Sequence, residues 1–306
     1  MSDVRIEDTS RTSPTTGPLY VAHTLKRATR PISGRRTSKG AWEATVSRPA
    51  KMSTWVAILA SVSVTAAVSA HAQEANDPPD TPEETASQHE SLSLLRQSRY
   101  VELDGKMNGI QRSYELGKIT DERLLHEFRA FYDTDPALAG KYDAWVEKMP
   151  RSYSARVARG IYLRYLGKQA RGGAYIEDTP PQQIEIMSTY LAKAMRDYNA
   201  SLTLTTKPLL TYHSIIAVTM LDAMIGGDDL AKRMLNESIR VDPRNFVVRF
   251  KYFASLQTRW GGSLQQMLDF EKQVRAAGLP DAQLRYFANM LVAERRWVQT
   301  GGRCCK

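Results

Sequence analysis

Hydrophobic side chains recur every three or four residues over most of the chain after residue 91, a spacing that predicts amphipathic α-helices. The stretch 230–256 shows this pattern most plainly. Its apolar positions, before and after a turn, are Leu230, Met234, Ile239 and Val241, then Phe246, Val247, Phe250, Phe253, Ala254 and Leu256. Pro243 has no amide hydrogen and disfavours helical geometry at Asp242. The first helix is therefore expected to end at Asp242, and Asp242 is expected to cap the second.

The same periodicity, interrupted by Gly and Pro, predicts a series of helices and no strand of any length. The expected ranges are 91–99, 100–116, 120–132, 136–149, 152–166, 180–202, 208–224, 230–241, 246–256, 263–277 and 281–297. Most connections between these ranges are short, so neighbouring helices are expected to pack antiparallel.

Proline and serine positions indicate a repeat in the C-terminal half. Pro208 and Pro243 are 35 residues apart, and Ser201 and Ser238 are 37 residues apart. These spacings are close to the period of about 34 residues in tetratricopeptide repeats. The segment 91–167 does not follow this period. We therefore predict an all-α fold of stacked antiparallel helical hairpins, a tetratricopeptide-like α-α superhelix with an irregular N-terminal helical cap.

Three segments of different composition precede the helical pattern. The chain opens with a stretch rich in Ser, Thr, Arg, Pro and Gly that has little apolar periodicity. An uncharged run and the small-residue pattern Ala70-His71-Ala72 follow, which is typical of a secretory signal peptide cleaved after Ala72. The predicted organisation is a disordered basic leader (1–51), a signal peptide (52–72), an acidic, proline-rich linker (73–90) and a single helical domain (91–306).

A signal peptide places the helical domain in the periplasm or outside the cell. The alternative is an uncleaved membrane anchor, in which case the N-terminal segment is the only contact with the membrane. The uncharged run spans 16 residues, from Trp55 to Ala70, whereas a spanning helix needs about 20 apolar residues. We therefore favour cleavage. Translation from Met1 and translation from Met52 both remain open.

The net charge of +9 is concentrated in the leader. Residues 1–51 hold 10 Lys/Arg and 4 Asp/Glu, which leaves 32 and 29 for the rest of the chain. This near balance argues against a nucleic-acid partner. The two cysteines, Cys304 and Cys305, are adjacent at the end of the chain and indicate no disulfide framework. No Cys or His neighbours complete a metal site around them, so we expect no metal and no cofactor.

Short motifs are spread over residues 91–294. They are Leu103-Asp104, Ile110-Gln111, Gly117-Lys118-Ile119-Thr120-Asp121-Glu122, Phe128-Arg129-Ala130-Phe131, Trp145, Pro150-Arg151-Ser152-Tyr153, Ala158-Arg159-Gly160, Ala170-Arg171-Gly172-Gly173 and Arg259-Trp260-Gly261-Gly262-Ser263. Together they resemble a bacterial family catalogued as a domain of unknown function, whose members are exported helical proteins with repeat-like character. The resemblance implies the same fold and compartment. It implies no catalytic residue, because that family has no assigned activity.

Arginine and tyrosine side chains alternate along the predicted helix 152–166. Arg156 and Arg159 are one turn apart, and Tyr162 follows them. Arginine holds carboxylates through two parallel hydrogen bonds, so on the concave side of stacked hairpins these residues would bind an acidic peptide or a chain terminus. The alternative, which we favour, is pairing inside the protein with acids such as Asp143, Glu147 and Glu177.

Arg259 and Trp260, before Gly261-Gly262, form a second candidate site. Trp260 would either stack on a ligand or, as we favour, fill the join between adjacent hairpins. In the second interpretation the glycines allow a tight turn and Ser263 caps the next helix.

Two groups that contain histidine are interpreted as structural. Asp121, Glu122, His126 and Glu127 lie within two turns of one predicted helix. Because no second histidine stands four residues from His126, we interpret this group as a solvent-exposed charged face. His213 lies in a strongly apolar helix without a nucleophile motif, and we interpret it as a core histidine with its hydrogen bonds satisfied.

These patterns favour a non-catalytic, exported binding or scaffold module. Its expected partner is a peptide or protein segment of the cell envelope, held in a concave helical groove. The candidate ligand-binding residues are Arg156, Arg159, Tyr162, Arg259 and Trp260. The alternative is an exported cell-wall hydrolase that uses paired carboxylates, such as Glu102 with Asp104 or Asp228 with Asp229. The sequence shows no apolar surroundings that would raise the pKa of one of them.

Overall fold

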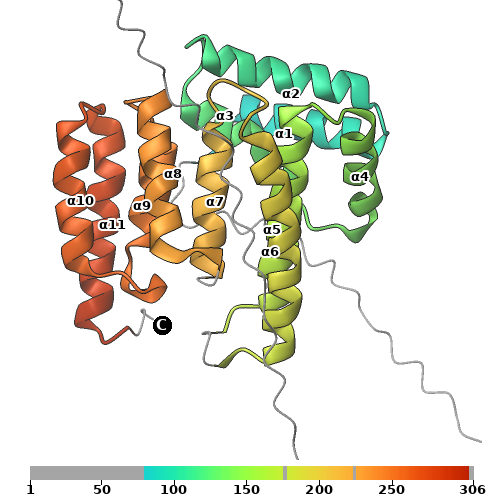
Figure 1. The fold of residues 1–306 in the computed structure, drawn as a ribbon. Coiled ribbons are helices and arrows are strands. Elements are labelled where there is room, and N and C mark those ends of the chain that lie inside the picture. Colours follow the sequence, from blue (N-terminus) through green and yellow to red (C-terminus); the bar gives the residue numbers. More distant parts are fainter. Residues whose placement is uncertain (1–78, 175–177, 223–224, 303–306) are drawn as a thin grey trace, which may run out of the picture. The chain divides into compact units, whose positions relative to one another are not determined.

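The computed structural model describes residues 79–174, 178–222 and 225–302. Within these residues it has eleven α-helices and no β-strand, which confirms the all-α class (Figure 1). The helices are α1 (Pro82–Arg96), α2 (Tyr100–Glu115), α3 (Asp121–Phe128), α4 (Ala139–Lys148), α5 (Tyr153–Arg171), α6 (Pro181–Ser201), α7 (Leu209–Leu221), α8 (Gly227–Val241), α9 (Val247–Ser255), α10 (Leu264–Ala276) and α11 (Asp281–Gln299).

Several predictions concern residues outside this described part. The leader 1–51, the signal peptide 52–72 and the tail with Cys304 and Cys305 all lie there, so they stay predictions. Among the described residues, no helix is both long enough and apolar enough to cross a membrane.

Helix α1 begins at Pro82, nine residues before the predicted start, so the linker predicted over 73–90 is helical in its second half. Thr81 accepts a hydrogen bond from the backbone N–H of Glu84, and the Glu84 carboxylate accepts one from the N–H of Thr81. This reciprocal pair satisfies two N–H groups that a helix start leaves open. Pro82 does not break the helix, because its fixed φ suits the first helical position and no N–H is needed there.

Aromatic side chains form the core beneath α3, α4 and α5. Phe131 lies edge-on to Phe128 and Tyr142, with ring centroids 5.8 and 6.0 Å apart. Trp145 completes this group and is fully buried. Pairs of this geometry stabilise a core beyond the burial of their area. The apolar faces predicted for the corresponding ranges therefore do meet in one core.

Helices α5 and α6 pack side by side (Figure 1). Gly160 allows this approach, because a Cβ atom at that position would lie 2.4 Å from Cε1 of Tyr198. The following helix α7 is buried at nearly every position and contacts α5, α6, α8 and α9. Consecutive helices also pair in α7–α8 and α10–α11. The helices differ widely in length, and the repeat period itself stays a prediction.

The turn between α8 and α9 lies where the sequence predicts it, but the cap of α9 comes from elsewhere. Asp242 accepts hydrogen bonds from the N–H of Arg244 and from the Tyr114 hydroxyl. The N–H groups of Phe246 and Val247, at the start of α9, instead donate to Oδ2 of Asp121, at 2.5 and 2.8 Å. The cap is thus a buried carboxylate from α3, more than 120 residues away in the sequence.

Candidate functional site

Arg156 and Arg159 on α5 are paired inside the protein. Nε and Nη2 of Arg159 each lie 2.7 Å from the Asp197 carboxylate, and Arg156 Nη1 lies 3.1 Å from it. Asp197 is on α6 and only 2% exposed. Arg159 also donates to Asp143, one of the acids expected for internal pairing. The interpretation of these arginines as ligand-binding residues is therefore corrected: they join α5 to α6.

Tyr162 does not face a ligand either. Its ring is buried and stacks on Tyr142 with centroids 4.5 Å apart, and its hydroxyl donates to the backbone carbonyl of Asp135. A tyrosine held at both its ring and its hydroxyl is part of the core. The prediction of Tyr162 as a binding residue is corrected on this ground.

Arg259 and Trp260 do line a cavity. It measures about 220 Å³, and its wall also includes Arg164, Lys168 and Lys251. The Arg259 guanidinium lies 5.9 Å from the Trp297 ring and donates to Gln257. The turn chemistry is as predicted, since Gly261 has a φ of +91° and Ser263 accepts from the N–H of Gln266 to cap α10.

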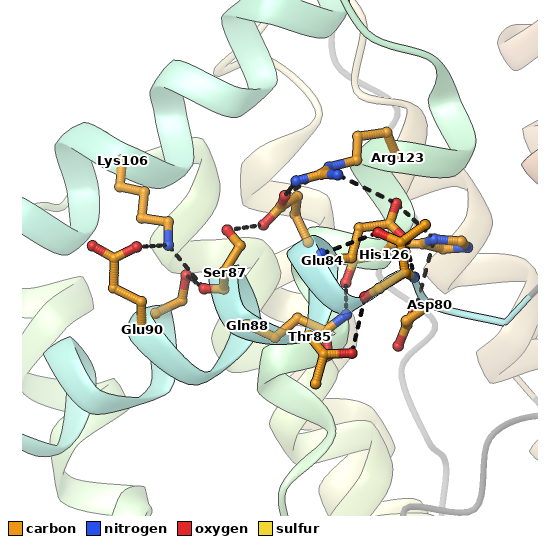
Figure 2. A network of polar contacts seen from close by, with 12 residues as sticks. Asp80, Glu84, Thr85, Ser87, Gln88, Glu90, Lys106, Arg123 and His126 are labelled. Atoms are coloured by element: carbon orange, nitrogen blue, oxygen red, sulfur yellow. Dashed lines mark hydrogen bonds and ion pairs between the residues drawn. The ribbon is translucent and has the colours of Figure 1, made fainter.

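The acidic and histidine group on α3 is not a solvent-exposed face, and that interpretation is wrong. Asp121, His126 and Glu127 are all buried. Helix α1, which begins earlier than predicted, covers His126 and Glu127, and Asp121 is bonded to the start of α9. Ser87 of α1 donates to Glu127, and Gln88 donates to the backbone carbonyl of His126 (Figure 2).

Acidic residues at the start of α1 surround His126. Its Nδ1 lies 2.9 Å from Oε1 of Glu84 and 3.5 Å from Oδ1 of Asp80. Arg123 and Arg129 balance these charges: Arg123 pairs with Glu127 and approaches Glu84, and Arg129 pairs with Asp80. Burial acts to raise the pKa of Glu84, but the hydrogen bonds that Glu84 accepts from Thr81, together with the electrostatic effect of His126, outweigh burial and hold that pKa below its ordinary value. Glu84 is therefore a carboxylate at neutral pH.

His213 on α7 lies in the core, as predicted. Burial and the charges of Arg164 and Arg129 lower its pKa to about 3. Its imidazole is therefore neutral at neutral pH, which excludes a role as a cationic ligand-binding group.

A larger cavity lies beside α2 and the start of α5. It measures about 530 Å³, within the range of small-molecule sites. Its wall comprises Asp104, Asn108, Gln111, Arg112, Glu115, Lys148, Met149, Pro150, Arg151, Ser152, Tyr153, Leu204 and Thr205. We call it the α2–α5 cavity.

The two acids of the α2–α5 cavity are occupied by the protein itself. Oδ1 of Asp104 accepts from the indole N–H of Trp145 at 3.1 Å. Glu115 accepts hydrogen bonds from the hydroxyl groups of Thr205 and Thr206 and from the N–H of Lys207. These bonds outweigh the effect of burial, which by itself raises the pKa, and they keep the pKa of Glu115 below its ordinary value. Both carboxylates are therefore held by hydrogen bonds within the protein.

Of the three basic side chains in the wall, Lys148 lies over the Tyr100 ring, whereas the two arginines are not paired within the described part of the protein. The side chains of Arg112 and Arg151 are exposed, and neither forms a hydrogen bond or an ion pair with a residue in the described part of the chain. Gln111 is 2% exposed, and its Nε2 donates to the carbonyl of Lys207 at 3.1 Å. Its Oε1 is buried and has no hydrogen-bond donor among the described residues. The cavity thus offers two guanidinium groups, whereas Oε1 of Gln111 has no accessible surface.

Gln111 and Arg151 occur in the motifs of the resemblance, but the sequence alone does not identify Arg112, Arg151 or Gln111 as binding residues, because exposed arginines and a glutamine within an amphipathic helix carry no signal of their own. A signal for the early start of α1 was present, since Thr81 followed three residues later by Glu84 is a capping box.

The paired carboxylates of the hydrolase alternative do not meet the requirements of that mechanism. Glu102 is exposed and paired with Arg99, which lowers its pKa, whereas a general acid needs a raised one. Asp228 and Asp229 are exposed in the first turn of α8.

Comparison with known proteins found no matching family model, no matching curated sequence and no matching solved structure. The resemblance to the exported bacterial family therefore stays a prediction from the motifs.

Proposed function

We propose that this protein is an exported, non-catalytic binding module that holds a carboxylate-bearing peptide segment in the α2–α5 cavity. The observation that carries this proposal is the pair of uncommitted guanidinium groups in the wall, those of Arg112 and Arg151. Two guanidinium groups suit a carboxylate, which a peptide provides at its C-terminus or on an acidic side chain.

The start of α5 adds to this preference for an anion. Ser152 caps the helix by accepting from the N–H of Ala155, and Asn108 accepts from the N–H of Ser154. These two N–H groups are therefore already used. The partial positive charge at the N-terminus of a 19-residue helix still favours an anion nearby.

Export is the second part of the proposal, and it rests on the signal-peptide pattern ending at Ala72 and on the motif resemblance. A periplasmic or secreted module would meet peptides and chain termini of the cell envelope. The proposed architecture of stacked hairpins, similar to tetratricopeptide repeats, is one that binds extended segments.

The test is a binding measurement with fluorescein-labelled pentapeptide libraries. One library has free C-terminal carboxylates and the other has amidated C-termini. We expect the purified protein to bind members of the first library and to lose at least about tenfold in affinity for their amidated forms, because a charge-assisted hydrogen bond contributes about 1.5–3 kcal/mol. Fluorescence anisotropy measures both.

The variant that tests the site is Arg112→Ala with Arg151→Ala. Its matched control is Arg233→Ala with Arg244→Ala, which removes two exposed arginines of α8 and the α8–α9 turn. Both variants lose the same charge. We expect the first to abolish the preference for free carboxylates and the second to retain it. Equal affinities in the two variants, or no binding to either library, would contradict the proposal.

A further inference from the structure

We propose that Asp80, Glu84 and His126 form a binding site for one divalent transition-metal ion, for which Zn²⁺ is the probe. One ligand atom from each residue lies within 4.8 Å of the other two. Glu84 and His126 are buried, and the Asp80 side chain is 22% exposed, which leaves one side open to solvent. This inference is independent of the peptide-binding proposal, because it concerns the junction of α1 and α3 (Figure 2).

The histidine supplies the observation that points to an ion. His126 is 5% exposed, and neither of its ring nitrogens forms a hydrogen bond with any described residue. Its Nδ1 is nevertheless only 2.9 Å from Oε1 of Glu84. The two atoms are therefore close together without forming a hydrogen bond. Two ligands of one metal ion have this arrangement, because the ion, and not the other ligand, lies on the nitrogen lone pair.

The spacing of the donor atoms fits a small ion. Zinc binds histidine nitrogen and carboxylate oxygen at about 2.0–2.2 Å in tetrahedral geometry, which places neighbouring ligand atoms about 3.3 Å apart. The separations from Nδ1 are 2.9 Å to Glu84 and 3.5 Å to Asp80. An imidazole among the three ligands favours zinc and similar divalent transition metals over Mg²⁺ and Ca²⁺, which prefer oxygen ligands.

The charges around Asp80, Glu84 and His126 are compatible with a bound cation. Three carboxylates, of Asp80, Glu84 and Glu127, face the two guanidinium groups of Arg123 and Arg129. With a neutral imidazole, this cluster has one excess negative charge. Hydrogen bonds from arginine to a ligating carboxylate are compatible with metal binding, since such outer partners orient the ligands. Arg129 on Asp80 and Arg123 near Glu84 are placed for that role.

The metal would fasten the start of α1 to α3. Asp80 and Thr81 stand just before α1, and Glu84 lies in its first turn. An ion that binds only the folded protein raises its stability in proportion to the logarithm of its concentration above Kd. Zinc is therefore expected to raise the melting temperature.

The experiment uses the full chain without an affinity tag, with Cys304→Ser and Cys305→Ser so that the adjacent thiols do not bind zinc. After treatment with a chelator, calorimetric titration with Zn²⁺ is expected to show one site per chain, with weaker binding of Mg²⁺ and Ca²⁺. The site variant is Asp80→Asn with Glu84→Gln. Each substitution keeps the shape of the original side chain, and the glutamine at position 84 can still form the capping box with Thr81.

The matched control is Glu83→Gln with His89→Asn, which changes two exposed residues of the same helix. We expect the site variant to lose at least about tenfold in zinc affinity and to lose the zinc-dependent rise in melting temperature, while the control retains both. Circular dichroism checks that each variant is helical. Absence of saturable zinc binding, equal affinity in the two variants, or equal affinity for Ca²⁺ would overturn the proposal and leave an ion-pair cluster only.

Discussion

Asp121 shows how one buried side chain connects distant parts of this chain. It lies in the first turn of α3, where its charge also suits the helix dipole. Its Oδ2 accepts from the N–H groups of Phe246 and Val247, which open α9. Two orphan donors of one helix are thus satisfied by the carboxylate of another.

We predict that Asp121→Ala lowers the free energy of unfolding by about 2–3 kcal/mol, because two buried N–H groups lose their acceptor. Urea denaturation measures the change. Asp281→Ala is the control, since Asp281 is an exposed residue in the first turn of α11, and we expect it to change stability by less than about 0.5 kcal/mol. Similar losses in the two variants would show that Asp121 is not the cap of α9.

At the scale of the element, most helices follow from the local sequence. The start of α3 at Thr120 is as predicted, because its hydroxyl accepts from the N–H of Arg123. The turn at Asp242–Asn245 is also as predicted. Such signals span one or two helical turns, so they can be interpreted without knowing the fold. Contacts between elements, such as that of α5 with α6, have no comparable signal.

We predict that Gly160→Ala destabilises the protein by about 1–3 kcal/mol, because the added methyl group forces α5 away from the Tyr198 ring on α6. The measurement is again urea denaturation. Gly105→Ala is the matched control: it is an exposed glycine inside α2 with no atom within 4 Å of the added Cβ. The control should gain about 0.5–1 kcal/mol through higher helix propensity. If the free energy of unfolding changed in the same direction in both variants, this would contradict the close approach of α5 and α6.

At the scale of the whole molecule, buried titratable groups link stability to pH. Burial raises the pKa of Asp121 to about 6, against the effect of its two hydrogen bonds. The folded protein therefore holds this proton more tightly than the unfolded chain, and its contribution to stability falls as the pH rises from about 4 to about 6. His213 acts in the opposite direction. Its pKa is lowered to about 3, so its contribution rises over the same interval.

We predict that Asp121→Asn makes stability rise more steeply with pH than in the unmodified protein. The variant removes the falling contribution of Asp121 and leaves the rising one of His213. Between pH 4 and pH 6 the two curves should diverge by on the order of 2 kcal/mol. Urea denaturation at pH 4, 5 and 6 gives both curves. Parallel curves would show that Asp121 does not titrate in this range.

The candidate sites could be predicted less well than the fold. The sequence shows Arg156 and Arg159 as a pair one turn apart, but their partner Asp197 lies about 40 residues away on another helix. The group at His126 was found in the sequence, yet its burial depends on α1. Arg259 and Trp260 do line a cavity. Their use by a ligand remains a prediction.

The sequence by itself determined the all-α class, most helix boundaries and the position of the turns, because periodicity, capping and backbone restrictions act over a few residues. The tertiary structure decided which charges are paired and which remain available. Asp197 neutralises the arginines of α5, Asp121 caps α9, and Arg112 with Arg151 is left facing a cavity. These outcomes depend on which helices pack together, and the pairing of side chains far apart in the sequence leaves no local pattern.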